Sequence, residues 1–154
     1  MAKINSKAIL NLAVPLTIIL FILLTKWWIV QVVDASNCIA YGFPLIYKSP
    51  AFHTSMAEQY FIMELLFDLL VYFLVIVTIL LALNRYFSEI KFKKSLSFVL
   101  YIIAVLLVSI QVVFSTIFET NFLIKRDFDI EVKQTGIKFY FYENERDTYN
   151  QLHQ

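Results

Sequence analysis

The sequence contains very little cysteine, glycine, proline or charge. Its 154 residues include one Cys, two Gly and three Pro, and 16% of them are charged. A single cysteine, Cys38, excludes an internal disulfide and any cysteine-rich metal site. The net charge of +1 gives no global field that would favour nucleic acid or an acidic substrate. No phosphate-binding glycine loop, zinc-protease helix or dinucleotide fingerprint is present. We therefore predict no cofactor, no metal and no nucleic-acid partner.

Apolar residues dominate instead, at 60% of the chain with a mean hydropathy of +0.70. Three apolar stretches cover residues 8–33, 60–83 and 96–118, and each is long enough to cross a bilayer. A cleaved signal peptide is the alternative for the first stretch, but Lys26-Trp27-Trp28 interrupts its end and no small-residue cleavage site follows. The pattern predicts an all-α membrane protein in which residues 1–118 form a three-helix transmembrane domain. Residues 34–59 would be a structured outside loop.

Basic residues predict how the chain is threaded through the bilayer. They precede the first stretch and connect the second to the third: Lys3, Lys7, Arg85, Lys91, Lys93 and Lys94. Basic segments stay on the cytoplasmic side, which predicts a cytoplasmic N-terminus and an extracytoplasmic C-terminus. Lys125, Arg126 and Lys133, which follow the third stretch, argue against this orientation. Frequent Ile, Phe, Lys, Asn and Tyr favour an AT-rich bacterial genome, and hence the bacterial inner membrane.

The tail, residues 119–154, is polar and carries a predicted β-hairpin over residues 127–142. Apolar and charged residues alternate in Asp127–Lys133, which is the period of a half-buried strand. Gln134-Thr135-Gly136 would provide the turn, and Ile137–Tyr142 a second strand rich in aromatics. An isolated hairpin is marginal in water, so this one needs another surface.

Lys26, Asp68 and Gln111 fall at a similar predicted depth in the membrane, and Glu64 lies one helical turn further out on the same face as Asp68. Together they form a predicted polar layer. Charges in hydrocarbon are expensive and usually paired, which favours an ion pair of Lys26 with Asp68 or Glu64. The alternative is that Lys26 snorkels to the interface beside its two tryptophans. We favour a structural role for this polar layer over a proton relay, because a single pair of acidic residues is weak support for a chain of proton transfers.

Aromatic residues make up 17% of the chain, and many of them lie outside the predicted spans. Exposed aromatic patches mark interaction sites, so we predict an interaction surface in the outside loop and the hairpin. Its residues are Tyr41, Phe43, Tyr47, Phe52, Phe139, Tyr140, Phe141 and Tyr142. Cys38 with His53 could form a nucleophile and base, and His53 with Glu58 could bind a metal. Neither spacing supports that chemistry, so we predict no catalytic residue.

The predicted function is that of a non-enzymatic integral membrane subunit. Its helices, outside loop and hairpin would dock into a larger inner-membrane assembly of other membrane subunits or of copies of itself. The first alternative is a homo-oligomeric pore or ion-conducting effector in which Glu64 and Asp68 line a path. The second is a small membrane enzyme that uses the outside loop.

Overall fold

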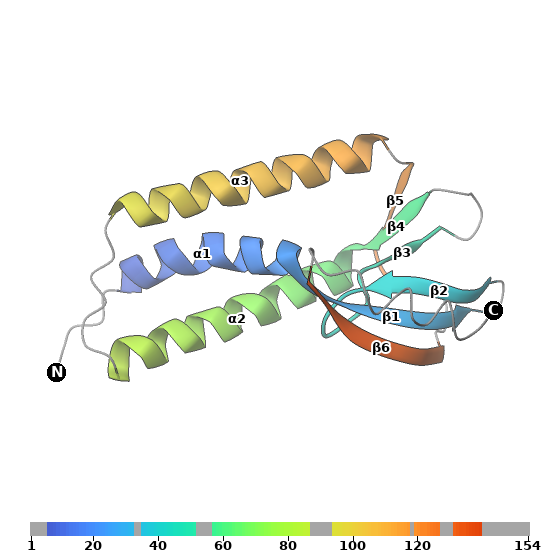
Figure 1. The fold of residues 1–154 in the computed structure, drawn as a ribbon, viewed down its shortest axis with the longest axis horizontal. Helices are drawn as coiled ribbons and strands as arrows, with labels where there is room; N and C mark the ends of the chain where they lie inside the picture. Colours follow the sequence, from blue (N-terminus) through green and yellow to red (C-terminus); the bar gives the residue numbers. More distant parts are fainter. Residues whose placement is uncertain are drawn as a thin grey trace.

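The chain folds into a row of helices that continues into a β-sheet at one end (Figure 1). The computed structural model describes residues 6–32, 35–51, 57–86, 94–117, 119–126 and 131–139. The helices are α1 (Ser6–Leu23), α2 (Ile62–Tyr86) and α3 (Lys94–Ile117). The strands are β1 (Leu24–Val32), β2 (Ala35–Tyr41), β3 (Lys48–Pro50), β4 (Glu58–Phe61), β5 (Thr120–Leu123) and β6 (Glu131–Phe139). The prediction of an all-α fold is therefore wrong.

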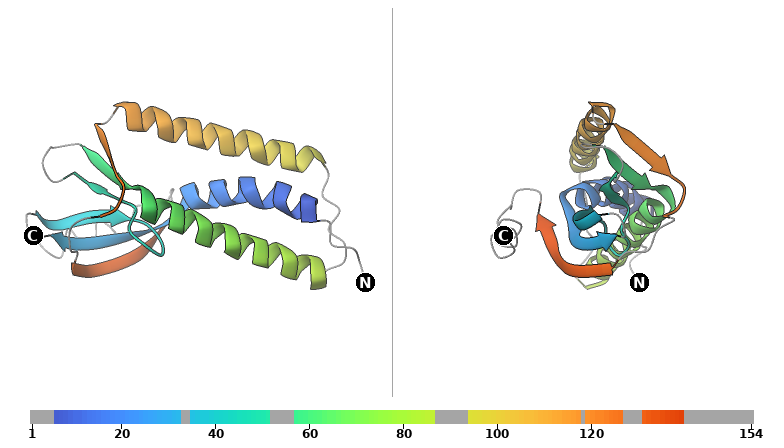
Figure 2. Two further views of the ribbon diagram at one scale, coloured as in Figure 1. Left: turned by 180° about the vertical axis from the view of Figure 1, so that it is seen from behind. Right: turned by 90° about the vertical axis from the view of Figure 1, so that its right-hand side faces the viewer.

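These strands form one mixed sheet in the order β5-β4-β3-β2-β1-β6. All neighbours are antiparallel except β4 and β5, which run parallel. The sheet is strongly curved, as the end view in Figure 2 shows. Val30, Ala40, Ile46 and Phe61 are buried together where the sheet meets the helices. The predicted outside loop, residues 34–59, thus contributes strands to the middle of the sheet.

The first predicted span, residues 8–33, is half helix and half strand. α1 ends at Leu23, and the chain continues without a break into β1, where Ile29 and Val30 are buried. The change follows from composition, because Thr25, Trp27, Trp28, Ile29, Val30 and Val32 are β-branched or aromatic residues. A hydropathy window cannot separate an apolar strand from an apolar helix, and for this reason the predicted helix wrongly included the residues of β1.

The predicted hairpin at residues 127–142 is also wrong. β6 is one continuous strand that pairs with β1 from Leu24↔Phe139 to Gln31↔Glu131. Gln134-Thr135-Gly136, the predicted turn, lies inside that strand. The Thr135 hydroxyl donates to the Trp27 carbonyl at 3.1 Å, and a Cβ at position 136 would overlap the Trp27 indole. Glycine therefore makes room for a tryptophan on the neighbouring strand. Residues 127–130 and 140–142 lie outside the described ranges.

α1 lies between α2 and α3 and packs against both of them (Figures 1 and 2). Its residues Ile9, Leu12 and Ala13 are buried against Ile76 and Leu80 of α2. Pro15 is fully buried and does not end the helix. The shortest helix is thus the central one, and it joins the two long helices into a single row.

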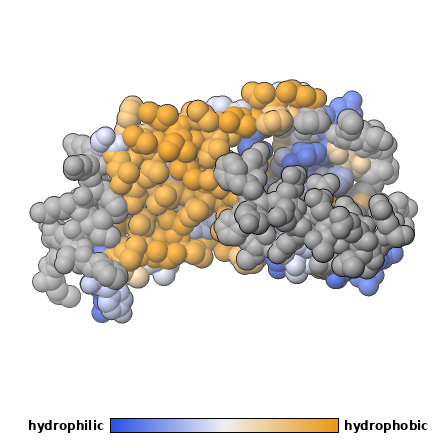
Figure 3. All heavy atoms as spheres, in the orientation of Figure 1, coloured by the Kyte–Doolittle hydropathy of each residue, from blue (hydrophilic) through white to orange (hydrophobic). Residues whose placement is uncertain are grey.

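α2 and α3 are both long and apolar enough to cross a membrane, whereas the apolar part of α1, Ile9–Leu23, is shorter. Most side chains of α3 are exposed, and the apolar surface covers the helical part of the molecule in Figure 3. The bounds of these two helices agree with the second and third predicted spans to within a few residues. A helix that is apolar on all sides requires an apolar surrounding.

Candidate functional site

The Asp68 carboxylate is the best-defined polar feature of the structure. Asp68 lies in the second turn of α2 and has no exposure to solvent. Its Oδ2 accepts a hydrogen bond from the Phe43 N–H at 2.7 Å, and its Oδ1 accepts one from the Leu45 N–H at 2.9 Å. Hydrogen bonds to a charged acceptor are shorter and roughly twice as strong as neutral ones. The buried charge is thus stabilised by two backbone amides.

The segment that supplies these amides, residues 42–47, is here named the Asp68 loop. Its first residue, Gly42, has a φ of 150°, and a Cβ at this position would overlap the Leu45 carbonyl oxygen. Only glycine suits both conditions. The next peptide bond, Phe43-Pro44, is cis. The turn residues of the sequence thus form a closed loop that turns its amides toward α2.

The rest of the Asp68 loop is bonded to the sheet. The Gly42 N–H donates to the Lys26 carbonyl at 3.0 Å, and the Trp28 indole N–H donates to the Gly42 carbonyl at 2.8 Å. At the other end, the Tyr47 N–H donates to the Tyr41 carbonyl, and the Tyr47 carbonyl accepts from Phe61. The Asp68 loop is therefore hydrogen-bonded to β1, β2, β4 and α2.

An aromatic cluster holds the junction of α1 and β1 beside the Asp68 loop. Phe21 stacks on Tyr47 with ring centroids 5.0 Å apart and meets Tyr72 edge-on at 5.5 Å. The Tyr72 hydroxyl donates to the Leu24 carbonyl at 2.7 Å, where the helix gives way to the strand. Burial raises the pKa of the Tyr47 phenol, so the ring stays neutral. This cluster explains how α1 can change into a strand without a turn.

Glu64 lies one helical turn before Asp68 and has a different environment. Its Oε1 accepts a long hydrogen bond of 3.4 Å from the Arg126 N–H. Its Oε2 is buried and has no hydrogen-bond partner among the described residues. The neighbouring Met63 N–H donates to the Ile124 carbonyl at 3.1 Å, which ties the start of α2 to the segment after β5. The second carboxylate is therefore only partly satisfied.

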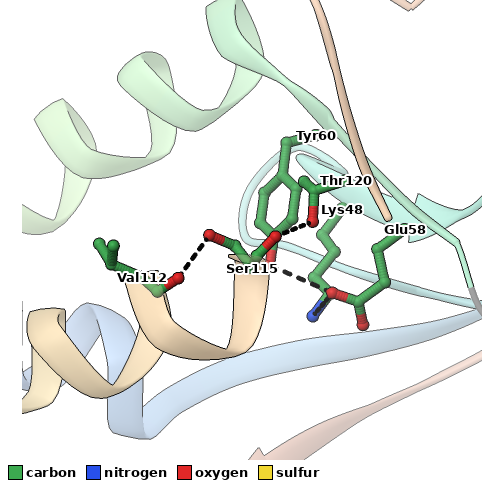
Figure 4. A network of polar contacts seen from close by, with 6 residues as sticks. All are labelled: Lys48, Glu58, Tyr60, Val112, Ser115 and Thr120. Carbon is green, nitrogen blue, oxygen red and sulfur yellow. Dashed lines mark hydrogen bonds and ion pairs between the residues drawn. The ribbon is translucent and has the colours of Figure 1, made fainter. Parts of the chain in front are cut away.

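A separate polar network joins β3 and β4 and lies close to the end of α3 (Figure 4). Lys48 forms a salt bridge of 2.7 Å with Glu58, and its ammonium lies 5.2 Å from the centroid of the Tyr60 ring. Burial lowers the pKa of Lys48, but the hydrogen bonds and charges of Glu58 and Tyr60 together outweigh it, so the pKa lies above its ordinary value. At the end of α3, Thr120 donates to the Ser115 carbonyl at 2.9 Å. Paired in this way, Lys48 and Glu58 stabilise the strands and are not free for chemistry.

The structure does not bring the predicted polar layer together. Lys26 lies in β1 and places its ammonium 4.0 Å from the centroid of the Trp28 ring, so the predicted ion pair with Asp68 is not formed. Gln111 lies on α3, which α1 separates from α2 (Figure 1). Only Glu64 and Asp68 share an element. The prediction assumed three full helical spans, and that assumption fails at Leu24.

The predicted aromatic surface is divided among several environments. Phe43 is 45% exposed, whereas Tyr41 and Tyr47 are half-buried, and Phe139 lies opposite Leu24 at the end of β6. Phe52, Tyr140, Phe141 and Tyr142 lie outside the described residues. Among the members whose side-chain exposure is described, Phe43 alone presents a large exposed apolar side chain.

The residues considered for catalysis or metal binding are not assembled in the described part of the chain. Cys38 lies in β2 opposite Val30, and burial raises the pKa of its thiol. A reactive cysteine needs a lowered pKa, so this environment disfavours a nucleophile. His53 is outside the described ranges, and the described residues contain no group of three metal-binding side chains.

Sequence reasoning identified Asp68 but missed its partners. The signal that could have found them is the turn Gly42-Phe43-Pro44, placed between apolar residues that need a surface to pack on. Comparison with protein-family models, with curated proteins and with solved structures gave no match. Function is therefore inferred from the geometry alone.

Proposed function

We propose that the chain is a non-enzymatic integral membrane protein of the bacterial inner membrane, which docks as a subunit into a larger assembly. One observation carries the proposal: all three helix–sheet junctions lie at the same end of an apolar helical row (Figure 1). A bilayer around α2 and α3 would leave the whole sheet on one side. The exposed apolar side chains of both helices would then face lipid or the helices of a partner.

In this arrangement α1 packs between the two spanning helices. Its 18 residues extend over about 27 Å, less than the roughly 30 Å of a hydrocarbon core, and of the described helices only α2 and α3 are long and apolar enough to be candidate spans. α1 contacts both of them. A short central helix fits this place, because its continuation, β1, enters the sheet at once.

The charge distribution favours an extracytoplasmic sheet. The segments that flank the opposite end of the helices hold Lys3, Lys7, Arg85, Lys91, Lys93 and Lys94. Of the twelve acidic residues in the chain, Glu89 alone lies in those segments. Basic connections are retained in the cytoplasm, and this contrast outweighs the basic residues found after α3.

Exposed apolar residues at the sheet end support docking to another protein. Phe122 of β5 is 63% exposed, and Ile124 just after it is 80% exposed. Outside the hydrocarbon, lipid cannot cover such residues, and apolar patches there mark protein contacts. The pore alternative has less support, because Asp68 is fully buried and its oxygens are occupied by loop amides. The surroundings of Asp68 thus favour the subunit over the pore.

Cysteine labelling and particle size test this proposal. In a Cys38→Ser background, Lys133→Cys on β6 should react with a membrane-impermeant thiol reagent in intact spheroplasts. Tyr86→Cys, at the far end of α2, should react only after lysis. The reverse pattern would place the sheet in the cytoplasm, and labelling of both in intact cells would contradict a membrane span.

Purification in mild detergent then separates the subunit from the pore. A subunit should migrate in a particle that contains at least one other protein in fixed ratio, and Phe122→Asp with Ile124→Asp should release it. Lys133→Asp, an exposed change on β6, is the matched control and should leave the particle intact. A discrete homo-oligomer free of other proteins would instead favour the pore.

A further inference from the structure

We propose that the Asp68 loop dips into the outer boundary of the bilayer, where Phe43 and Leu45 contact lipid. This inference depends on the proposed membrane insertion of α2 and α3. It concerns a different part of the chain, which is not a helix. The surface is formed by the exposed side chains of Phe43 and Leu45, at 45% and 42% exposure. Its partner is the lipid of the interfacial zone and upper acyl chains.

Depth is the first argument. α2 has 25 residues and spans about 37 Å, so a hydrocarbon core of about 30 Å centred on it leaves roughly 4 Å of helix outside at each end. Asp68 lies six residues after Ile62, which is about 9 Å along the axis. Hydrogen bonds of 2.7 and 2.9 Å hold the loop at this height. The backbone of Phe43 and Leu45 would therefore lie about 5 Å inside the hydrocarbon boundary.

The surroundings at this height are apolar as well. Phe67 and Leu70 of α2 flank Asp68 in the sequence and are exposed. Both side chains point away from Asp68 around the helix, so they show that α2 is exposed at this height without contacting the Asp68 loop themselves. In the proposed function the surrounding at this height is lipid, and Phe43 and Leu45 are suited to it.

The third argument is the pairing of backbone groups. Irregular backbone is tolerated at membrane depth only where its polar groups are satisfied by protein. The amides of Gly42, Phe43, Leu45 and Tyr47 all donate hydrogen bonds, and Pro44 has no N–H. The carbonyl groups of Gly42 and Tyr47 accept hydrogen bonds as well. Four of the five N–H groups of the Asp68 loop are thus satisfied within the protein, which lowers the cost of placing this backbone at the edge of the hydrocarbon.

The charges beside the loop are consistent with that location. The Asp68 carboxylate is turned inward and satisfied, so it presents no charge to the surroundings. Lys26 places its ammonium over the Trp28 ring and 5.9 Å from the centroid of the Phe43 ring. A lysine beside aromatic rings is typical of the membrane interface, where its ammonium reaches the headgroups.

Fluorescence quenching by spin-labelled lipids tests the loop. The protein, with Cys38→Ser, is reconstituted in vesicles and labelled with an environment-sensitive fluorophore at Phe43→Cys or Leu45→Cys. A nitroxide near the headgroup end of the acyl chain should quench both positions several-fold more than a nitroxide near the terminal methyl. Iodide in the water should quench them weakly. Val132→Cys, an exposed apolar position on β6, is the matched control. Both nitroxides should quench it weakly, and iodide should quench it strongly.

A label at Val105→Cys, an exposed position midway along α3, separates the two proposals. Quenching of Val105 by the deep nitroxide, together with strong iodide quenching of Phe43 and Leu45, would overturn the loop insertion and leave the membrane spans standing. Absence of lipid quenching at Val105 would overturn the proposed function, and the loop inference with it. Quenching of the loop positions by neither probe would show that a protein covers them, which also rejects a lipid contact.

A second variant tests whether Asp68 sets the depth of the loop. Asp68→Asn retains one carbonyl acceptor but places an NH₂ group against the other loop amide. Lipid quenching at Leu45→Cys should fall several-fold in this background, while quenching at Val105→Cys stays unchanged. Unchanged quenching at Leu45 would show that Asp68 does not set the depth of the loop.

Discussion

The two carboxylates near the start of α2 differ in how completely the chain satisfies them. The Asp68 carboxylate accepts two short hydrogen bonds and is covered by a loop that is itself hydrogen-bonded to the sheet. One turn earlier on the helix, Glu64 has one long hydrogen bond and one buried oxygen without a described partner. The comparison shows that a carboxylate in an apolar helix is not by itself evidence of a relay. What surrounds its oxygens decides its role.

The largest expected effect is that of Asp68→Leu. The change leaves the buried amides of Phe43 and Leu45 without acceptors, and each stranded donor costs about 1–3 kcal/mol. We expect a marked loss of folded protein in mild detergent, measured as a lowered midpoint of thermal unfolding. Glu64→Leu is the matched change one turn away and should lower the midpoint far less. Equal losses at the two positions would remove the distinction between the two carboxylates of α2.

Gly42→Ala should come next, because it acts on the same loop through its backbone. A Cβ would overlap the Leu45 carbonyl oxygen, and a positive φ adds strain of about 1–3 kcal/mol for a residue other than glycine. The thermal midpoint should fall, with Gly136→Ala as the control. The atoms in the way at position 136 belong to the Trp27 side chain, which can shift. A larger effect at Gly136 would show that the β1–β6 pairing limits stability more than the Asp68 loop does.

Lys26→Met should have a smaller effect and separates two views of Lys26. The ion pair predicted from the sequence would make this change cost about 3–5 kcal/mol, since it would leave Asp68 uncompensated. The structure replaces that pair with an ammonium over Trp28, a contact worth about 0.5–1 kcal/mol at an exposed site. The midpoint of unfolding for Lys26→Met should therefore stay near that of the parent protein. A loss as large as that of Asp68→Leu would restore the ion pair.

How much could be predicted from the sequence differs between the two halves of the molecule. The long apolar helices α2 and α3 were predictable because their period and length leave few alternatives. β1 and β6 were not, because their pairing joins residues at least 100 positions apart. A local pattern contains no information on such a partner, so Thr135-Gly136 was interpreted as a turn.

The candidate site shows the same division on a smaller scale. Asp68 could be singled out, because a carboxylate in an apolar run requires an explanation. Its partners could not, because backbone amides have no signature in the sequence and any residue can supply one. A search for the partner among side chains led to Lys26, the nearest cation by predicted depth. The observed partners are the amides of Phe43 and Leu45. The sequence marks this segment as a turn, but it does not show that the turn packs against α2.

The smallest expected effect is that of Glu64→Gln, and it addresses the less satisfied of the two carboxylates. The amide oxygen can still accept from the Arg126 N–H, so the one described hydrogen bond of Glu64 is retained. The change also removes a negative charge from a site where one oxygen is buried and unpartnered. We therefore expect the thermal midpoint in detergent to stay within the range of neutral surface changes, about 0.5 kcal/mol in either direction. A midpoint lowered as far as by Asp68→Leu would contradict this view of Glu64.

The informative comparison is between detergent and native membranes, because a docked partner could provide the donor that the Glu64 Oε2 atom lacks. In that case Glu64→Gln should be neutral in the isolated chain but should weaken recovery of the larger particle, while Asp68→Asn should destabilise the isolated chain itself.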